Sequence, residues 1–302
     1  MRAVLCPKSG PPEVLQVSEV KKPFPQAGEI LVKVRCATVT RGDVVLRRIP
    51  RAVLAVLGAL FGFKAMKIPG VEYAGEVEEI GGNVTSFNKG DPVYGTTTGM
   101  RFGANAEYVC VPEKPKQGVI ARKPAAIAFE QAAASTVGAM TALQLLKRSQ
   151  IKSGDKVLVY GASGSVGSYA VQLAKHFGAA VTGVCSAANL DLIRSIGADQ
   201  VVDYTMEDFT VNGQRYDIIF DAVGKLPKSR CGDSLTAAGR YTSIKSPTRE
   251  RIAELEYVQE RVASGEIEVL IDREYPLEQI VEAHRYVESG RKRGNVLIRI
   301  AD

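Results

Sequence analysis

Residues Val157–Gly167 read VLVYGASGSVG, an apolar run that ends in a turn containing Gly161, Gly164 and Gly167. The overlapping stretch VGSYAVQLAKHFG, residues 166–178, carries apolar side chains at helical spacing. A buried strand, a tight glycine turn and a helix in this order are the context of a dinucleotide-binding motif. The glycines allow the tight turn, let backbone N–H groups approach a pyrophosphate and let the helix pack closely on its strand. The stretch therefore predicts the start of a Rossmann sheet, the alternative being a turn that only packs.

The end of the second strand bears on the choice of cofactor. In folds that prefer NAD, an acidic residue about twenty positions past the glycines accepts a hydrogen bond from the ribose 2′-hydroxyl. Ser186 stands there in this chain, within VTGVCSAANLD. A small hydroxyl leaves room for a 2′-phosphate and lacks the carboxylate that would repel it, so the sequence favours NADPH. Ser186 could instead cap the following helix, and the two roles are compatible.

Composition places the chain among ordinary globular proteins. It has 302 residues, 45% of them hydrophobic and 24% charged, with a formal net charge of +6. The length favours two domains. Its basic residues form short scattered runs without interleaved aromatic residues, so we expect no nucleic-acid partner. The cysteines are widely spaced, which is typical of free thiols in a reducing cytoplasm; they are Cys6, Cys36, Cys110, Cys185 and Cys231.

The N-terminus resembles a first strand rather than a signal peptide. The strongly apolar segment 49–63, IPRAVLAVLGALFGF, is too short to span a bilayer, so no transmembrane segment is expected. We interpret it as a helix that covers a cleft, with a membrane-surface helix as the alternative. Its apolar character suggests a small apolar substrate.

The pattern of apolar and turn-forming residues changes at two points along the chain. Residues 1–122 show short alternating segments broken by Gly and Pro, a β-barrel pattern, whereas 123–248 alternate strands and helices, the pattern of a parallel sheet covered on both faces. Within this part we expect a helix over FEQAAASTVGAMTALQLLKRS and another over SRCGDSLTAAG. Residues 249–302 predict a helix (252–264), a strand (268–272), a helix (277–289) and a strand (295–300).

Several motifs together resemble the medium-chain dehydrogenase/reductase superfamily, in its zinc-independent quinone oxidoreductase branch. They are TRGDVVLRR (40–48), similar to the strand on the nicotinamide side, IPGVEYAGEVEEIG (68–81), AAASTVGAMTAL (132–143), the glycine turn, and PLEQIVEAHRYVESGRKRGNVLI (276–298). The resemblance implies a GroES-like catalytic domain (1–122 and 249–302) interrupted by a Rossmann nucleotide-binding domain (123–248). It places the nicotinamide in the cleft between them.

The resemblance also bears on whether the protein binds a catalytic zinc ion. Zinc-dependent members bind the catalytic ion with Cys, His and Cys, and these positions read Thr40, Val71 and Val137 here. Such side chains cannot supply the thiolate and imidazole ligands that zinc prefers, so no metal is expected. Without a Lewis acid, hydride delivery to an already conjugated acceptor is the easier chemistry. The implied activity is NADPH-dependent reduction of a quinone or an α,β-unsaturated carbonyl.

The family pattern suggests a set of site residues. Thr40, Asp43 and Thr141 match positions near the nicotinamide, although Asp43 could equally fix its loop through hydrogen bonds, and Tyr73 and Tyr94 are alternative proton donors. Ser163, Gly164, Val166 and Gly167 should line the pyrophosphate. The candidates for the 2′-phosphate are Ser186, Asn189, Tyr204 and Arg293. Because many relatives carry a lysine or arginine where Ala188 and Asn189 stand here, NADH is an alternative cofactor.

Two further functional hypotheses compete with the reductase. One is a nucleotide-binding relative with little turnover, because metal-free hydride transfer requires no nucleophile that the sequence could reveal. The other is a generic NAD(P)-dependent alcohol dehydrogenase.

Few residues separate GRYTSIK from the next predicted helix, which predicts a parallel sheet of five strands. The family resemblance implies a further strand that pairs across a dimer at this edge of the sheet, and the short connection calls that strand into question. We expect a homodimer by analogy.

Overall fold

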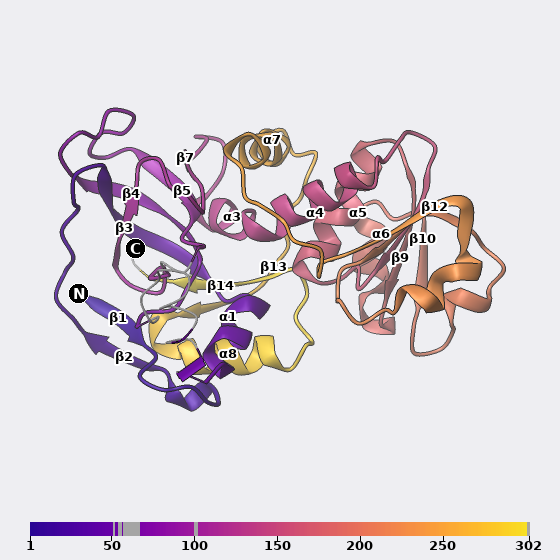
Figure 1. Cartoon of the computed structure of the whole chain (residues 1–302), viewed down its shortest axis with the longest axis horizontal. Helices are drawn as coiled ribbons and strands as arrows, with labels where there is room; N and C mark the ends of the chain where they lie inside the picture. Colours follow the sequence, from indigo (N-terminus) through magenta and orange to yellow (C-terminus); the bar gives the residue numbers. More distant parts are fainter. Residues whose placement is uncertain (51, 54–55, 57–66, 100–101, 301–302) are drawn as a thin grey trace. The chain divides into compact units, whose positions relative to one another are not determined.

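The computed structural model describes residues 1–50, 52–53, 56, 67–99 and 102–300. By their contacts these residues form two compact units. The first unit comprises Met1–Thr136, Arg251–Gln259 and Ile271–Asp302, and the second comprises Val137–Glu250 and Glu260–Leu270. Figure 1 shows the elements of both units in sequence colours.

The first unit is built on a curved seven-stranded sheet with the order β13-β14-β3-β4-β5-β7, in which β6 also pairs with β3. All its pairs are antiparallel except β13 with β14, which run parallel. A separate hairpin joins β1 and β2. The strands are β1 (Arg2–Leu5), β2 (Gln16–Glu19), β3 (Glu29–Thr38), β4 (Glu72–Ile80), β5 (Pro92–Thr96), β6 (Tyr108–Pro112), β7 (Ile120–Arg122), β13 (Ile271–Pro276) and β14 (Asn295–Arg299).

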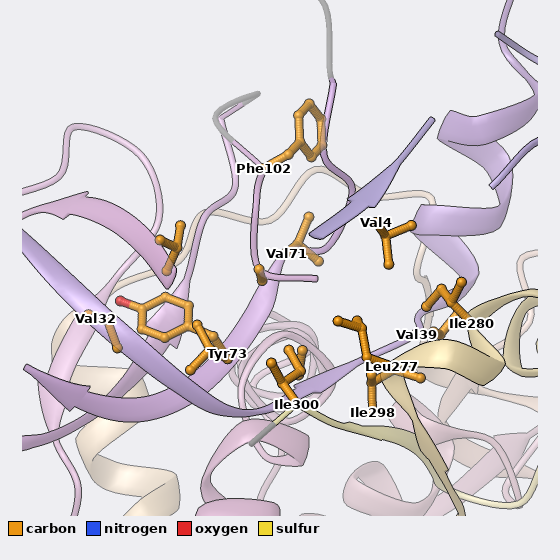
Figure 2. Close-up of a cluster of buried hydrophobic side chains, with 14 of the residues drawn as sticks. Val4, Val32, Val39, Val71, Tyr73, Phe102, Leu277, Ile280, Ile298 and Ile300 are labelled. Atoms are coloured by element: carbon orange, nitrogen blue, oxygen red, sulfur yellow. The ribbon is translucent and has the colours of Figure 1, made fainter. Parts of the chain in front are cut away.

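The inward faces of these strands make one apolar core. Figure 2 shows side chains from β1, β3, β4 and β14 converging there, among them Val4, Val32, Tyr73 and Ile298. Period-two alternation directs every second residue of a strand to one face, and this produces the core from the pattern read in residues 1–122. Leu277 and Ile280 close the core from the C-terminal helix region.

The helices of the first unit are α1 (Arg41–Arg48), α3 (Phe129–Ala134) and α8 (Ile280–Glu288), with short 3₁₀ turns η1 (Pro12–Val14) and η5 (Leu277–Gln279). The expectation of a strand over TRGDVVLRR was wrong, because these residues begin a helix. Thr40 is the N-cap, and its Oγ1 accepts a hydrogen bond from the backbone N–H of Asp43 while the Asp43 carboxylate accepts one from the Thr40 N–H. This capping box overrides the β-propensity of Val44 and Val45.

Two other boundaries also differ from the sequence predictions. The helix expected over 129–149 is broken at Ser135 and Thr136, where Thr136 Oγ1 donates to Glu72 Oε1 at 2.7 Å. The strand expected at 268–272 begins at Ile271 instead. The main chain of Glu268 is engaged by a side chain: its N–H donates to Gln172 Oε1 at 2.7 Å and its carbonyl accepts from Gln172 Nε2 at 3.0 Å.

The second unit holds a five-stranded sheet in which every pair is parallel, with the order β10-β9-β8-β11-β12. The five-stranded parallel sheet predicted from the sequence is thus confirmed. Its elements are α4 (Val137–Arg148), β8 (Lys156–Tyr160), α5 (Ser165–His176), β9 (Ala180–Cys185), η2 (Ala187–Asn189), α6 (Leu190–Ser195), β10 (Gln200–Asp203), η3 (Phe209–Val211), β11 (Tyr216–Asp221), η4 (Lys228–Ser234) and β12 (Leu235–Ser243). Helix α7 (Ile252–Ala263) crosses from the first unit into the second.

The helix expected over SRCGDSLTAAG was wrong in its second half. Residues 228–234 form the 3₁₀ helix η4, and β12 already starts at Leu235, which pairs with Tyr216 of β11. A Cβ at Gly239 would lie 2.9 Å from the carbonyl oxygen of Tyr216, so the two chains approach closely there. Pairing with β11 therefore outweighs the local helical pattern.

Most of segment 49–63, for which we predicted a covering helix, lies outside the described residues. Of that segment the structure describes positions 49–50, 52–53 and 56, and positions 52, 53 and 56 are helical. In the described part of the chain, no helix combines the length and apolar character that a bilayer crossing requires.

Candidate functional site

The strand order of the second unit reverses between β8 and β11. The chain runs from β8 to β9 and β10 on one side, and then returns to build β11 and β12 on the other side. In open parallel sheets, ligands bind outside the carboxyl ends of the strands at such a switch point. The glycine turn that follows β8 lies at this place.

The three glycines of the turn meet three different steric demands. Gly161 has φ +80°, a left-handed conformation that side chains with a Cβ rarely adopt. A Cβ at Gly167 would lie only 2.1 Å from the carbonyl oxygen of Gly161, so this glycine lets α5 pack onto the turn. A Cβ at Gly164 would meet nothing nearer than the Gly161 carbonyl oxygen at 3.6 Å, which leaves open space beside the turn.

Helix α5 begins directly at that open space. Its N-cap is Gly164, and no side chain caps the first turn, which contains Val166 and Gly167. Uncapped N–H groups at the start of a helix, together with the helix dipole, attract an anion. The turn therefore fits a pyrophosphate, because open space beside Gly164 adjoins a helix start that no side chain caps.

Three of the predicted cofactor residues meet beside this turn. Asn189 Nδ2 donates hydrogen bonds to Ser163 Oγ and to Ser186 Oγ, each at 3.2 Å. Ser163 comes from the turn after β8, whereas Ser186 and Asn189 follow β9. Ser186 occupies the N-cap position of η2, but its side chain makes no capping hydrogen bond. The cluster thus presents hydroxyl and amide groups at the end of β9.

The other nucleotide candidates lie in different surroundings. Tyr204 is 56% exposed and follows β10, and its N–H donates to the carbonyl of Cys185 at 3.1 Å, next to Ser186. Arg293 belongs to the first unit, where its Nε lies 3.5 Å from Asp272 Oδ1. Thr141 is half-buried on α4, between buried neighbours.

Thr40 and Asp43 are brought together in the first unit. Asp43 Oδ2 accepts hydrogen bonds from the N–H of Thr40 at 2.8 Å and from its Oγ1 at 2.6 Å. Asp43 is buried, and burial raises the pKa of its carboxyl group, although the hydrogen bonds from Thr40 oppose this shift. The contacts of Asp43 are those of a residue that fixes the start of α1.

The two tyrosines considered as proton donors are core residues. Tyr73 and Tyr94 are both almost fully buried in the first unit, and burial raises the pKa of both phenols. The Tyr73 ring packs among the apolar side chains drawn in Figure 2.

Side chains that could ligate a metal ion are not clustered in the described part of the chain. Within the residues that the structure describes, no three His, Cys, Asp or Glu side chains come close enough to form a metal site. Of the two histidines, His284 is fully buried on α8, where burial and then the charge of Arg47 lower its pKa to about 3. His176 pairs instead with Glu266, its Nδ1 lying 3.0 Å from the carboxylate.

One residue at the switch point had no role in the sequence interpretation. Asp221 is the last residue of β11, and its carboxylate is buried at the same edge of the sheet as the glycine turn. An acidic residue that directly follows the apolar run IIF, three positions before Gly224, was the available signal.

An uncapped glycine turn at the switch point of a parallel sheet defines a dinucleotide-binding protein of the Rossmann class. Comparison with known families agrees with this class. The model of the alcohol dehydrogenase GroES-like domain matches residues 26–124, and models of zinc-binding dehydrogenases match 165–269 and 245–298.

Among curated proteins, the chain is 31% identical to a chloroplastic quinone-oxidoreductase homolog from Spinacia oleracea, over 96% of this chain and 95% of that protein. It is 32% identical to a chloroplastic NADPH-dependent alkenal/one oxidoreductase from Arabidopsis thaliana, over 76% of this chain and 63% of that protein. A solved structure of quinone oxidoreductase from Escherichia coli complexed with NADPH superimposes with a TM-score of 0.82 at 26% identity, covering 99% of this chain and 100% of the other.

The chain therefore belongs to the medium-chain dehydrogenase/reductase superfamily, in its quinone-oxidoreductase-like branch. The predicted fold class, a GroES-like domain with a Rossmann sheet, is confirmed. The domain boundaries drawn from the sequence stay predictions.

Proposed function

We propose that this protein is an NADPH-dependent oxidoreductase that reduces a quinone or an α,β-unsaturated carbonyl without a metal ion. The observation that carries the proposal is the glycine turn with its uncapped helix start, flanked by the Ser163–Asn189–Ser186 cluster. The turn suits a pyrophosphate, and the cluster offers neutral polar groups where an NAD-preferring protein carries a carboxylate. The similarity to a quinone-oxidoreductase homolog and to an NADPH-dependent alkenal/one oxidoreductase supports the same activity.

The proposed reaction requires few chemical groups from the protein itself. When bound, the reduced nicotinamide supplies a hydride to an acceptor whose conjugation carries the new charge to oxygen. The chain's own residues then have to bind the cofactor, orient the acceptor and exclude water. We assign the pyrophosphate to Ser163, Gly164, Val166 and Gly167, and the 2′-phosphate to Ser186 and Asn189 with Tyr204 and Arg293.

On the nicotinamide side we retain Thr141, Thr40 and Asp43 as site residues. For Asp43 the hydrogen bonds to Thr40 favour a structural contribution, since they hold the loop that precedes α1. The proton that completes the reduction comes from solvent in this proposal, because Tyr73 and Tyr94 are buried in the core.

The proposal is tested by following NADPH oxidation with a panel of quinones and enones as acceptors. We expect turnover on conjugated acceptors and none on saturated aldehydes or ketones. Tight NADPH binding without turnover on any acceptor would favour the alternative hypothesis, that this protein binds the nucleotide but has little or no catalytic activity. Oxidation of simple alcohols that depends on added zinc would favour the alcohol dehydrogenase.

We also propose a cytoplasmic location and a homodimer. The location is inferred from the wide spacing of the five cysteines in the sequence, which is typical of a reducing compartment, although the names of the two plant relatives assign those proteins to the chloroplast. Fractionation of the native cells tests the location, and sedimentation equilibrium of the purified chain tests the dimer.

A further inference from the structure

The side-chain amide of Asn105 is a polar group buried in the first unit. Asn105 lies between β5 and β6 and is fully buried. Within the described residues, neither Nδ2 nor Oδ1 of this amide has a hydrogen-bond partner. The backbone of Asn105 is engaged, because its N–H donates to the carbonyl of Pro69 at 3.0 Å and its carbonyl accepts from the N–H of Val4 at 2.9 Å. The side chain is thus the part of Asn105 that the fold does not use.

An unpaired amide in the interior lowers the stability of the protein. A buried donor and a buried acceptor without partners forfeit the hydrogen bonds that both would make with water in the unfolded chain. A leucine has nearly the same branched shape as Asn105 and would fill the position without that loss. Polar groups that a fold retains in spite of such a loss are expected at functional sites.

The surroundings of Asn105 connect it with the site residues of the first unit. A Cβ added to Gly70 would lie 2.6 Å from Asn105 Oδ1, so the amide packs directly against Gly70. The N–H of Gly70 interacts with the carboxylate of Asp43 and opposes the rise in its pKa that burial causes. Asp43 accepts hydrogen bonds from Thr40, and Gly70 directly precedes Val71. Gly70 therefore links the amide to two of the three positions that the family resemblance assigns to zinc ligands.

A strained loop accompanies the unpaired amide. Phe102, which packs in the apolar cluster of Figure 2, has φ +56°, a left-handed conformation that aromatic residues rarely adopt. Gly103 follows with φ +104°. The N–H of Phe102 donates to the carbonyl of Thr97 at 3.1 Å, and Thr97 Oγ1 donates to the carbonyl of Gly70 at 3.0 Å. Backbone strain is characteristic of functional sites, and here it lies three residues from Asn105.

Reduction of an α,β-unsaturated carbonyl creates negative charge on an oxygen atom. The hydride, supplied with its electron pair by the reduced nicotinamide, forms a new C–H bond at the β-carbon. The electron pair of the C=C bond moves between the α-carbon and the carbonyl carbon, and the carbonyl π pair moves to oxygen. The enolate takes up a proton from solvent, which completes the reduction. A hydrogen-bond donor at that oxygen stabilises the transition state more than the ground state.

We propose that Asn105 is a catalytic residue whose Nδ2 donates this hydrogen bond to the oxygen of the acceptor. The inference rests on the proposed function. A neutral amide polarises a carbonyl less than a metal ion does, which suits an acceptor whose conjugation already spreads the charge. The acceptor reaches the enclosed amide when residues 102–104 move, and this movement relieves the strain at Phe102.

Asn105→Leu is the decisive variant, because it removes the donor and keeps the shape of the side chain. We expect kcat and kcat/KM for a conjugated acceptor to fall about 100-fold, with the dissociation constant for NADPH, measured by calorimetry, at the wild-type value. The isotope effect with NADPH deuterated at the transferred position should rise, because hydride transfer becomes slower. The urea midpoint of unfolding should rise as well, because the unpaired amide is gone.

Tyr73→Phe is the matched control. The Tyr73 hydroxyl is buried in the same unit and also has no hydrogen-bond partner among the described residues. Its removal should leave both kinetic constants unchanged and should not lower the urea midpoint. Asn105→Ala, with a smaller side chain, should lose as much activity as Asn105→Leu at unchanged NADPH affinity, and it decides the matter if the leucine variant does not fold.

The inference is overturned if a folded Asn105→Leu or Asn105→Ala reduces conjugated acceptors as fast as the wild type does. It is also overturned if Asn105→Leu loses stability and NADPH affinity together with activity, since the amide would then support the fold. An equally large loss of activity in Tyr73→Phe would contradict it in the same way. A wild-type chain without turnover on any acceptor contradicts the proposed function itself.

Discussion

At the level of single residues, the proposed preference for NADPH rests on the carboxylate that Ser186 lacks. Its hydroxyl is held by Asn189, whose amide also binds Ser163, so the three side chains form one neutral polar group. A carboxylate at this position would stand where a 2′-phosphate is proposed to bind. Charge, rather than shape, is then the simplest way to change the preference.

We predict that Ser186→Asp reverses the preference between the two coenzymes. The new carboxylate repels the 2′-phosphate and offers an acceptor to a free 2′-hydroxyl, so kcat/KM for NADPH should fall at least about 10-fold while that for NADH is kept or rises. Steady-state kinetics with both coenzymes measures the ratio. Ser186→Ala, which adds no charge, serves as the control, and equal losses in both substitutions would refute the assignment.

A second residue-scale prediction concerns His284. Burial and the charge of Arg47 lower its pKa to about 3, below the ordinary value of 6.5. A group with a depressed folded-state pKa contributes its full stability above the unfolded value and loses it as the pH falls through the folded value. Between pH 6.5 and 3, protonation of the unfolded chain should therefore cost the fold up to about 1.4 kcal/mol per pH unit from this residue.

The variant His284→Leu tests this. Neither ring nitrogen of His284 has a hydrogen-bond partner, so an apolar replacement leaves no protein group unpaired. We expect the variant to match the wild type in free energy of unfolding at neutral pH and to lose less of it on acidification. Urea titrations at several pH values give both quantities. Parallel losses in the two chains would contradict the prediction.

At the scale of elements, the start of α1 shows how one cap decides between two conformations. The stretch from Asp43 to Arg48 contains β-branched residues, yet it is helical because Thr40 and Asp43 satisfy each other's backbone N–H groups. The helix dipole also favours Asp43 in the first turn and Arg47 and Arg48 in the last turn.

We predict that Thr40→Ala lowers the free energy of unfolding by about 1 kcal/mol, the usual cost of removing an N-cap side chain. Thr40→Ser keeps the hydroxyl and should retain most of that stability. Chemical denaturation of the three chains provides the comparison. If the Ala and Ser variants were equally stable, the cap would not be what holds α1.

At the level of the whole molecule, the proposed reaction requires that the active protein work without a bound metal ion. Two of the three matched family models are those of zinc-binding dehydrogenases, yet the positions that the family resemblance assigns to the catalytic ligands hold Thr40, Val71 and Val137. Valine has no donor atom, and a lone threonine hydroxyl is a poor zinc ligand.

We therefore predict that NADPH-dependent reduction survives exhaustive dialysis against a chelator and is not raised by added zinc. Elemental analysis of the active protein should find less than stoichiometric zinc. A zinc-dependent relative treated in the same way provides the positive control. Loss of activity on chelation with recovery on adding zinc would overturn the metal-free mechanism.

The sequence alone determined the features that depend on near neighbours. The alternation of residues 1–122, the strand–turn–helix at Val157–Gly167 and the five parallel strands all follow from periodicity and glycine placement, which act over a few residues. The position of Ser186 followed from spacing along the motif. Such local rules need no knowledge of which distant segments meet.

Other features depend on contacts between segments that are far apart in the sequence. Gln172 engages the main chain of Glu268 and delays the start of β13, and Tyr216 draws Leu235 into β12 in place of a helix. Asp221 collects donors from its own loop and from Ser243, more than twenty positions away. These contacts are set by the register of strands and helices that are far apart in the chain, and the free energy of such pairing exceeds the weak local preferences that it overrides.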